Sequence, residues 1–261
     1  MITKPNPAEI DAFRRARLEA VTGPTGDAAL IGTHWITDPA DVDGFPGHWS
    51  LVAGNPTRLR YVASASDGVT SAGVLVAGDM LLASATQGGA VLSYGASRCA
   101  TALYWPGLGM AVRVWDANSA ADVVAIETYP YDAGWRIEGV YAPHQRTVDY
   151  EYHGHGGRLE GRHVVGEVTL TISAREVVLL VTQNASGLTA VFGDATNGRE
   201  TYGGGRFVAV EATQDMRAIV DFNTATLPPC AFSPYFDCPL PPPQNVIKGP
   251  IPAGEKRIVR R

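Results

Sequence analysis

The segment ETYGGGRF (200–207) combines one arginine with three consecutive glycines, residue types that suit the binding of an anion. Three glycines in a row are ordered only where the backbone needs a positive φ or where another chain or ligand approaches closely. Arg206 follows them directly and Asp221 lies downstream, so the two side chains could form a bidentate guanidinium–carboxylate pair. Two interpretations follow: a structural ion pair that ties a strand to the C-terminal segment, or an arginine that presents its guanidinium to an anionic ligand.

Three histidines, His153, His155 and His163, raise the question of metal binding. In an extended strand His153 and His155 would face the same side and could chelate one ion. The glycines around them favour a turn, and neither an HExxH motif nor paired CxxC motifs accompany them. We therefore expect a solvated glycine-rich loop and no metal site.

The three cysteines, Cys99, Cys230 and Cys238, are too few for a disulfide scaffold. Cys230 and Cys238 could reach each other across a short loop, but in a reducing compartment two free thiols are favoured. A nucleophilic Cys230 would need a nearby histidine and a lowered pKa, and nothing in the sequence places a histidine there. Packing of a small buried side chain is the favoured role for Cys230.

One α-helix is expected near the N-terminus, before the candidate site residues in the sequence. It starts with Asn6 as N-cap and Pro7 at the first helical position, and it ends before Gly23. Apolar residues recur between these points at three-to-four spacing, which predicts a helix that packs one stripe on a sheet. Binding to a membrane surface is disfavoured by the three arginines expected on its polar face, Arg14, Arg15 and Arg17.

The rest of the chain is typical of short antiparallel strands. Runs rich in Val, Ile, Tyr and Trp alternate with turn-forming clusters at intervals of roughly ten residues. The clearest runs are 28–36, 57–64, 109–116, 122–129, 135–142 and 162–173. This pattern predicts an all-β protein with three parts: an N-terminal helix (1–24), a β-sandwich-like module (25–142), and a compact antiparallel β-barrel (143–261).

Residues 228–252, which we name the strap, hold nine of the 18 prolines. Proline cannot donate a ladder hydrogen bond, so the strap is no central strand. It also carries apolar residues that a solvated linker would not need: Cys230, Phe232, Tyr235, Phe236, Leu240, Val246 and Ile251. We therefore expect an ordered strap that folds back over the barrel and closes it, rather than a linker or a disordered end.

Composition excludes several classes of protein. The 261 residues are 45% hydrophobic, which is enough for a sizeable core and excludes wholesale disorder. The formal net charge of −5 argues against nucleic acid as a partner, because such proteins need a basic stripe. No secretory signal or apolar run long enough to span a bilayer occurs, so we expect a cytoplasmic protein without a membrane partner.

Several segments resemble a bacterial family known as domain of unknown function 1684. They include RTVDYEYHGHGGRLEG (146–161), FGDATNGRETYGGGRFVAVE (192–211) and VDFNTATLPPCAFSPYFDCPLPPPQN (220–245), of which the last is the most specific. Similarity extends into the first half through LIGTHWI (30–36) and GMAVRVWD (109–116). The chain departs from the family pattern at Thr226–Leu227, where a Tyr-Asn pair is usual. The resemblance implies no activity, because the family name records none.

Together these features predict a binding module for a small anionic ligand at the junction of the strap and the barrel. Arg206 would anchor the anion, Asp221 would orient Arg206, and the remaining site residues are Tyr202, Asn223, Asn245, Cys230 and Cys238. The alternatives are a hydrolase that uses the Asp221/Arg206 pair, a flavin-dependent barrel oxidoreductase, and a protein-interaction module in which the strap is the docking ligand. The cofactor and the oligomeric state stay open.

Overall fold

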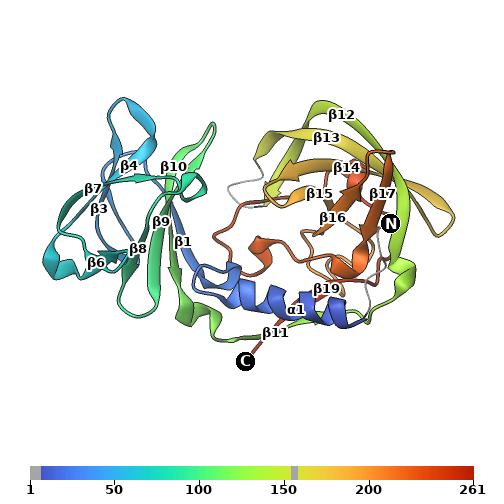
Figure 1. Cartoon of the computed structure of the whole chain (residues 1–261), viewed down its shortest axis with the longest axis horizontal. Coiled ribbons are helices and arrows are strands. Elements are labelled where there is room, and N and C mark those ends of the chain that lie inside the picture. Colours follow the sequence, from blue (N-terminus) through green and yellow to red (C-terminus); the bar gives the residue numbers. More distant parts are fainter. Residues whose placement is uncertain (1–6, 154–157) are drawn as a thin grey trace. The chain divides into compact units, whose positions relative to one another are not determined.

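This computed structural model describes residues 7–153 and 158–261, so the expected N-cap Asn6 and the histidine candidate His155 lie outside the described residues. The chain divides into two compact units, one of residues 1–18 and 123–261 and the other of residues 19–122. Apart from short 3₁₀ turns, the regular secondary structure in the described part of the chain is β-strand and one α-helix, as predicted (Figure 1). No helix in that part is both long and apolar enough to cross a bilayer.

The boundary between the two units does not lie between residues 142 and 143, where a domain boundary is expected from the sequence. Both of these residues lie inside β12 (Arg136–His153), a single strand that pairs with β13, β17 and β18 along its length. A domain boundary cannot lie in the middle of a strand whose two ends belong to one sheet. The chain instead divides between Asp122 and Val123.

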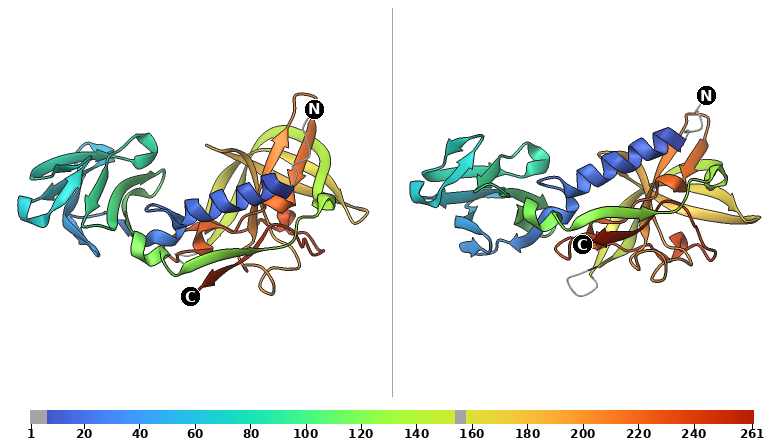
Figure 2. Two further views of the ribbon diagram at one scale, coloured as in Figure 1. Left: turned by 60° about the horizontal axis from the view of Figure 1, so that its bottom comes forward. Right: turned by 90° about the horizontal axis from the view of Figure 1, so that it is seen from below.

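Helix α1 (Pro7–Thr22) keeps part of its predicted apolar stripe buried, at Ile10 and Val21. Two arginines expected on its polar face are only partly exposed. Arg14 donates from Nη2 to the carbonyl oxygen of Tyr129 at 2.7 Å, and Arg17 donates to another main-chain carbonyl at 3.1 Å. Figure 2 shows α1 running alongside β11 (Val123–Thr128) and β19 (Glu255–Arg260), which pair with each other. Long side chains thus fasten the helix to the residue after β11 and to Leu227, just before the strap.

Residues 19–122 form two antiparallel sheets around one core. The six-stranded sheet has the order β1-β10-β9-β8-β5-β6 and the four-stranded sheet the order β2-β3-β4-β7. The core takes Trp49 and Tyr61 from the smaller sheet and Met110 and Val112 from the larger one, which gives the predicted sandwich-like module. The strands are β1 (Leu30–Trp35), β2 (Ala40–Val42), β3 (Phe45–Val52), β4 (Asn55–Ala63), β5 (Val69–Ser71), β6 (Val74–Leu75), β7 (Gly78–Ala83), β8 (Val91–Tyr94), β9 (Arg98–Trp105) and β10 (Gly109–Asp116).

The other unit is built on a sheet that closes into a ring. Its strands follow the order β13-β14-β15-β16-β17-β12-β18, and an additional pairing between β12 and β13 joins the first strand to the sixth (Figure 1). Closure gives each of the six strands two neighbours, as the predicted barrel requires. The remaining strands are β13 (Leu159–Ile172), β14 (Arg175–Asn184), β15 (Gly187–Phe192), β16 (Arg206–Ala212), β17 (Arg217–Asp221) and β18 (Cys238–Pro239).

The 3₁₀ turns connect these strands, and two of them, η7 and η8, lie in the strap. They are η1 (Asp27–Ala29), η2 (Ala65–Asp67), η3 (Ala85–Gln87), η4 (Ala117–Ala120), η5 (Ala133–Trp135), η6 (Phe222–Thr224), η7 (Pro229–Ala231) and η8 (Pro243–Asn245). Prolines occupy the first position of both η7 and η8, where the missing N–H costs no hydrogen bond.

The strap is ordered and lies on the ring, as predicted. Leu240 donates its N–H to Glu151 of β12 at 2.7 Å, and Ile247 donates its N–H to Gly193 at 2.8 Å. Its buried apolar side chains include Phe232, Ile247 and Ile251, whereas the expected anchors Tyr235 and Val246 are exposed. The strap therefore completes the core of the ring with fewer apolar contacts than its composition indicated.

Candidate functional site

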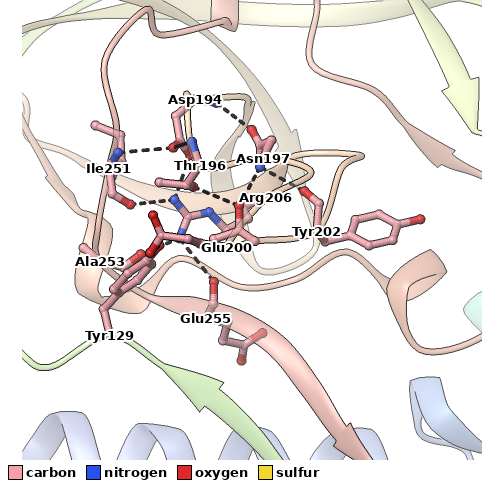
Figure 3. A network of polar contacts seen from close by, with 11 residues as sticks. Tyr129, Asp194, Thr196, Asn197, Glu200, Tyr202, Arg206, Ile251, Ala253 and Glu255 are labelled. Carbon is pink, nitrogen blue, oxygen red and sulfur yellow. Dashed lines mark hydrogen bonds and ion pairs between the residues drawn. The ribbon is translucent and has the colours of Figure 1, made fainter.

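Arg206, the first residue of β16, has no exposed surface. Its Nη2 donates to Asp194 Oδ2 at 2.8 Å and to the carbonyl oxygen of Ile251 at 2.8 Å, while Nη1 donates to the carbonyl oxygens of Ala253 and Glu255 (Figure 3). The guanidinium also stacks over the Phe192 ring, 5.1 Å from its centroid. Arg206 therefore fastens the residues after the strap to the ring and has no free face for an external anion.

The predicted partner of Arg206 was wrong. Arg206 pairs with Asp194, whose side chain is fully buried, and not with Asp221. The second oxygen of Asp194, Oδ1, accepts from the N–H groups of Thr196 and Ile251, so the carboxylate also orders its own turn. Of the two interpretations of this arginine, the structural ion pair between a strand and the C-terminal segment is the one that the geometry supports.

Gly205 explains why glycine precedes this arginine. Its φ is +84°, and a Cβ there would lie 2.7 Å from the carbonyl oxygen of Phe192 and 2.5 Å from Pro241. The glycine run thus meets the expectation of a positive φ with close approach, but the approaching group is the strap itself and not a ligand.

Asp221 and Asn223 form a separate hydrogen-bonded pair at the end of β17. Asp221 Oδ1 accepts from the N–H and the side-chain amide of Asn223, at 3.0 and 2.8 Å. The Asn223 side chain in turn accepts from the N–H of Asp132 at 3.0 Å and donates to its carbonyl at 2.9 Å. These two predicted site residues therefore hold η6 against the segment before β12.

Asn245 is fully buried between β14 and β15. Its Oδ1 accepts from Leu180 N at 2.7 Å, and its Nδ2 donates to the carbonyls of Leu180 and Val191 at 3.1 and 2.8 Å. The register of the β14–β15 pair, in which Thr182 faces Thr189, would place Leu180 opposite Val191 if the pairing continued. The Asn245 amide replaces the main-chain hydrogen bonds that β14 and β15 do not make with each other here. It thereby holds the strap in the opening between the two strands.

Tyr202, Cys230 and Cys238 come together beside this framework. The Tyr202 hydroxyl lies 3.7 Å from Cys230 Sγ, and Cys238 Sγ accepts from the N–H of Cys230 at 3.3 Å. Both cysteines are buried and present as thiols. Hydrogen bonds from the Cys238 thiol and the Tyr202 phenol hold the pKa of Cys230 below its ordinary value, although burial acts in the opposite direction. Burial, with the Cys230 sulfur close by, raises the pKa of Tyr202.

A pocket of about 330 Å³, which we name the basic pocket, opens where the start of the strap meets β19. Tyr202 lines the pocket, and its hydroxyl also contacts Cys230 Sγ, so one predicted site residue lies between the pocket and the two thiols. Its other lining residues are Gly198, Arg199, Glu200, Thr201, Leu227, Ala231, Lys256, Arg257, Ile258 and Arg260. Four of these side chains are basic and one is acidic, which is the opposite of the net charge of the whole chain.

The partners of these charges leave a positive surplus. Glu127 accepts from Lys256 and Arg257, and these hydrogen bonds hold the pKa of Glu127 below its ordinary value. Glu200 accepts from the Tyr129 hydroxyl at 3.0 Å (Figure 3). Arg199 is exposed, and its side chain has no carboxylate partner in the part of the chain that the structure describes. Lys256, Arg257 and Arg199 set against Glu127 and Glu200 leave a surplus of one positive charge, with Arg260 left out of the count.

Sequence reasoning missed the basic residues of this pocket. The signal that could have found them is the cluster of cations in EKRIVRR (255–261), which stands out in an acidic chain. No group of three metal-ligating His, Cys, Asp or Glu side chains occurs among residues 7–153 and 158–261, and His163 is exposed on β13.

Three comparisons with known proteins bear on the chain. The family model described as protein of unknown function (DUF1684) matches residues 122–256, which is about half of the chain. No curated protein matches the chain. The solution NMR structure of an uncharacterized protein from Haloarcula marismortui is 27% identical, covers 53% of this chain and 80% of its own, and superposes with a TM-score of 0.43.

Proposed function

We propose that this chain, which belongs to the DUF1684 family of proteins of unknown function, binds a small anionic ligand in the basic pocket. The observation that carries the proposal is the surplus of positive charge in a concave site of an otherwise acidic protein. Clefts lined by charge of one sign raise the local concentration of ligands of the opposite sign. The site was expected at the junction of the strap and the barrel; the basic pocket lies instead between the start of the strap, residues 198–202 and β19, and its anchoring residues differ from those predicted.

The size and chemistry of the pocket suit a small anion with a compact apolar part. A volume of about 330 Å³ lies at the lower end of the range for small-molecule sites, roughly 300–1,000 Å³. Arg199 and Arg257 supply planar guanidinium groups, which bind phosphate or carboxylate through two parallel hydrogen bonds. Leu227, Ala231 and Ile258 give an apolar wall. A phosphate ester or a carboxylate with a few carbon atoms meets these requirements.

Arg206 has a supporting role in this proposal. It holds the carbonyls of Ile251, Ala253 and Glu255, and so it fixes the start of β19, from which Lys256 and Arg257 project. The hydrolase alternative, which relied on an Asp221–Arg206 pair, is not carried forward because Arg206 pairs with Asp194. The pocket needs Arg206 only as a buried support.

Thermal unfolding tests the proposal without knowledge of the natural ligand. Inorganic phosphate, sulfate and pyrophosphate are each compared with sodium chloride at equal ionic strength. A ligand at about one hundred times its Kd stabilises the folded state by about 2.7 kcal/mol, so a specific anion raises the Tm by several degrees, and the rise grows with the logarithm of the anion concentration above Kd.

The variant Arg199→Glu separates specific binding from general salt effects. It reverses the charge of a pocket residue that is exposed and outside the buried network, so the fold is expected to persist. Arg58→Glu makes the same charge change on an exposed residue of β4 that does not line the pocket. Loss of the anion effect in Arg199→Glu but not in Arg58→Glu supports the proposal, whereas equal anion effects in both variants refute it.

A further inference from the structure

Two thiols eight residues apart in sequence meet inside the strap. Cys230 lies in η7 and Cys238 begins β18, which pairs with β12. The N–H of Cys230 donates to Cys238 Sγ at 3.3 Å, and the Cys238 thiol is within hydrogen-bonding reach of the Cys230 sulfur. The two sulfurs are therefore neighbours before any reaction.

The surroundings of Cys230 favour its thiolate. The Cys238 thiol and the Tyr202 hydroxyl both donate toward Cys230 Sγ, and the raised pKa of Tyr202 keeps that hydroxyl protonated. Cys99 provides the contrast within the same chain. Its surroundings are apolar, burial raises its pKa, and its sulfur has a long contact of 3.9 Å with a carbonyl oxygen. Thiolate character and exposure govern susceptibility to oxidation; Cys99 and Cys230 are equally buried, at 8% exposed, so the difference in thiolate character decides between them.

We propose that Cys230 and Cys238 form a redox-active dithiol that reduces a hydroperoxide, with Cys230 as the attacking sulfur and Cys238 as the resolving sulfur. The juxtaposition of the two sulfurs and the Tyr202 hydroxyl carries this inference. It goes beyond anion binding and holds whether or not the basic pocket takes a ligand.

The proposed reaction has two steps. The Cys230 thiolate attacks the terminal peroxide oxygen, the O–O bond breaks, and the leaving oxygen takes up the proton lost by the thiol to give an alcohol or water. Cys230 is now a sulfenic acid. The Cys238 sulfur then attacks the Cys230 sulfur, the S–S bond forms, and the S–O bond breaks to release water together with the Cys238 proton. The two thiols lose two electrons and the O–O bond gains them; an external dithiol restores the reduced protein.

Tyr202 is a positioning residue in this reaction, because it acts through the Cys230 sulfur. Loss of its hydrogen bond raises the pKa of Cys230. For each pKa unit the thiolate fraction below that pKa falls tenfold while nucleophilicity rises about threefold, so the net rate falls about threefold. The pH profile of the oxidation rate must also move to higher pH, which a merely structural role would not produce.

The test uses the full-length reduced protein, with hydrogen peroxide as the probe. Aliquots are alkylated and mapped by mass spectrometry over time. The proposal predicts a Cys230–Cys238 disulfide that dithiothreitol reverses, while Cys99 stays available for alkylation. Cys99→Ser must leave the rate unchanged, and Tyr202→Phe must slow it and shift its pH profile upward.

Cys238→Ser keeps the attacking sulfur and removes the resolving one. In this variant a Cys230 sulfenic acid accumulates and is trapped by dimedone. The proposal is overturned if Cys99 oxidises as fast as Cys230 in the wild-type protein, or if no Cys230–Cys238 crosslinked peptide forms. Both outcomes are measured on the wild-type chain, so the proposal can be overturned even if a variant fails to fold.

Discussion

At the scale of single residues, the ion pair between Arg206 and Asp194 is the most consequential interaction in the ring. Both side chains are fully buried, and between them they hold five main-chain groups of two segments, residues 251–255 and the turn at Thr196. A buried ion pair repays its desolvation only when its remaining hydrogen-bonding groups are satisfied, as most of them are here. Its contribution is to fix the C-terminal segment rather than to bind an external ion.

Removal of the arginine charge tests this role. Arg206→Met leaves the Asp194 carboxylate buried without its partner, and we expect a loss of about 3–5 kcal/mol in the free energy of unfolding, measured in urea. Arg217→Met breaks the exposed pair with Asp215 and serves as the control, with essentially unchanged stability. A small effect of Arg206→Met would contradict the buried role.

Two buried tyrosines make stability depend on alkaline pH. Burial raises the pKa of Tyr61 to about 12, and burial together with the hydrogen bond to Glu200 raises that of Tyr129 to about 12. An unfolded tyrosine titrates near pH 10. Between about pH 10 and 12 the unfolded chain therefore loses protons that the folded chain keeps, and stability falls as the pH rises through this window.

The ionised-tyrosine absorbance checks this dependence. Tyr61→Phe and Tyr129→Phe should each remove one late-titrating group from the folded protein and flatten the fall of stability with pH. If every tyrosine of the native protein titrated near pH 10, the burial of these two phenols would be contradicted.

At the scale of elements, the strap replaces part of a β-ladder. β14 and β15 pair only near their turn, and the Asn245 side chain then takes the hydrogen bonds that Leu180 and Val191 would otherwise share. The ring thus opens locally for the strap, and the Asn245 amide pairs the N–H of Leu180 and the carbonyls of Leu180 and Val191. This arrangement makes one amide side chain responsible for three bonds.

Asn245→Ala should therefore be costly for so small a change. It leaves three buried main-chain groups without partners, and an unsatisfied buried group costs about 1–3 kcal/mol, so a loss of about 2–4 kcal/mol is expected. Amide exchange at Leu180 should accelerate in the same variant. Gln244→Ala, at the exposed neighbouring position, should change neither quantity; equal effects of the two variants would contradict the account.

The elements were largely predictable from the sequence, whereas their partners were not. Turn-forming clusters and alternating β-branched residues mark the strands locally, and the apolar residues of the strap predict its order. Which carboxylate meets Arg206 depends on strand register and on the path of the strap, which spacing does not encode. Asp194 and Asp221 are equally plausible from the sequence alone. The role of Asn245 needs an interrupted pair of strands, for which no local pattern exists.

At the scale of the whole molecule, the chain contains two separate cores. One surrounds Trp49 and Tyr61 in residues 19–122, and the other surrounds Phe192 and Phe222 in the ring. We expect calorimetry to resolve two unfolding transitions and Arg206→Met to lower only the one that belongs to the ring. A single transition that shifts as a whole in this variant would contradict separate unfolding.

Binding of an anion is the central claim, and isothermal titration calorimetry with inorganic pyrophosphate tests it most directly. We expect saturable binding to the wild-type protein. Arg199→Glu should weaken this binding at least about tenfold, since a lost charge-assisted contact is worth about 1.5–3 kcal/mol, and Arg58→Glu should leave it unchanged. No saturable binding to the wild-type protein, or equal binding to the two variants, would contradict this claim.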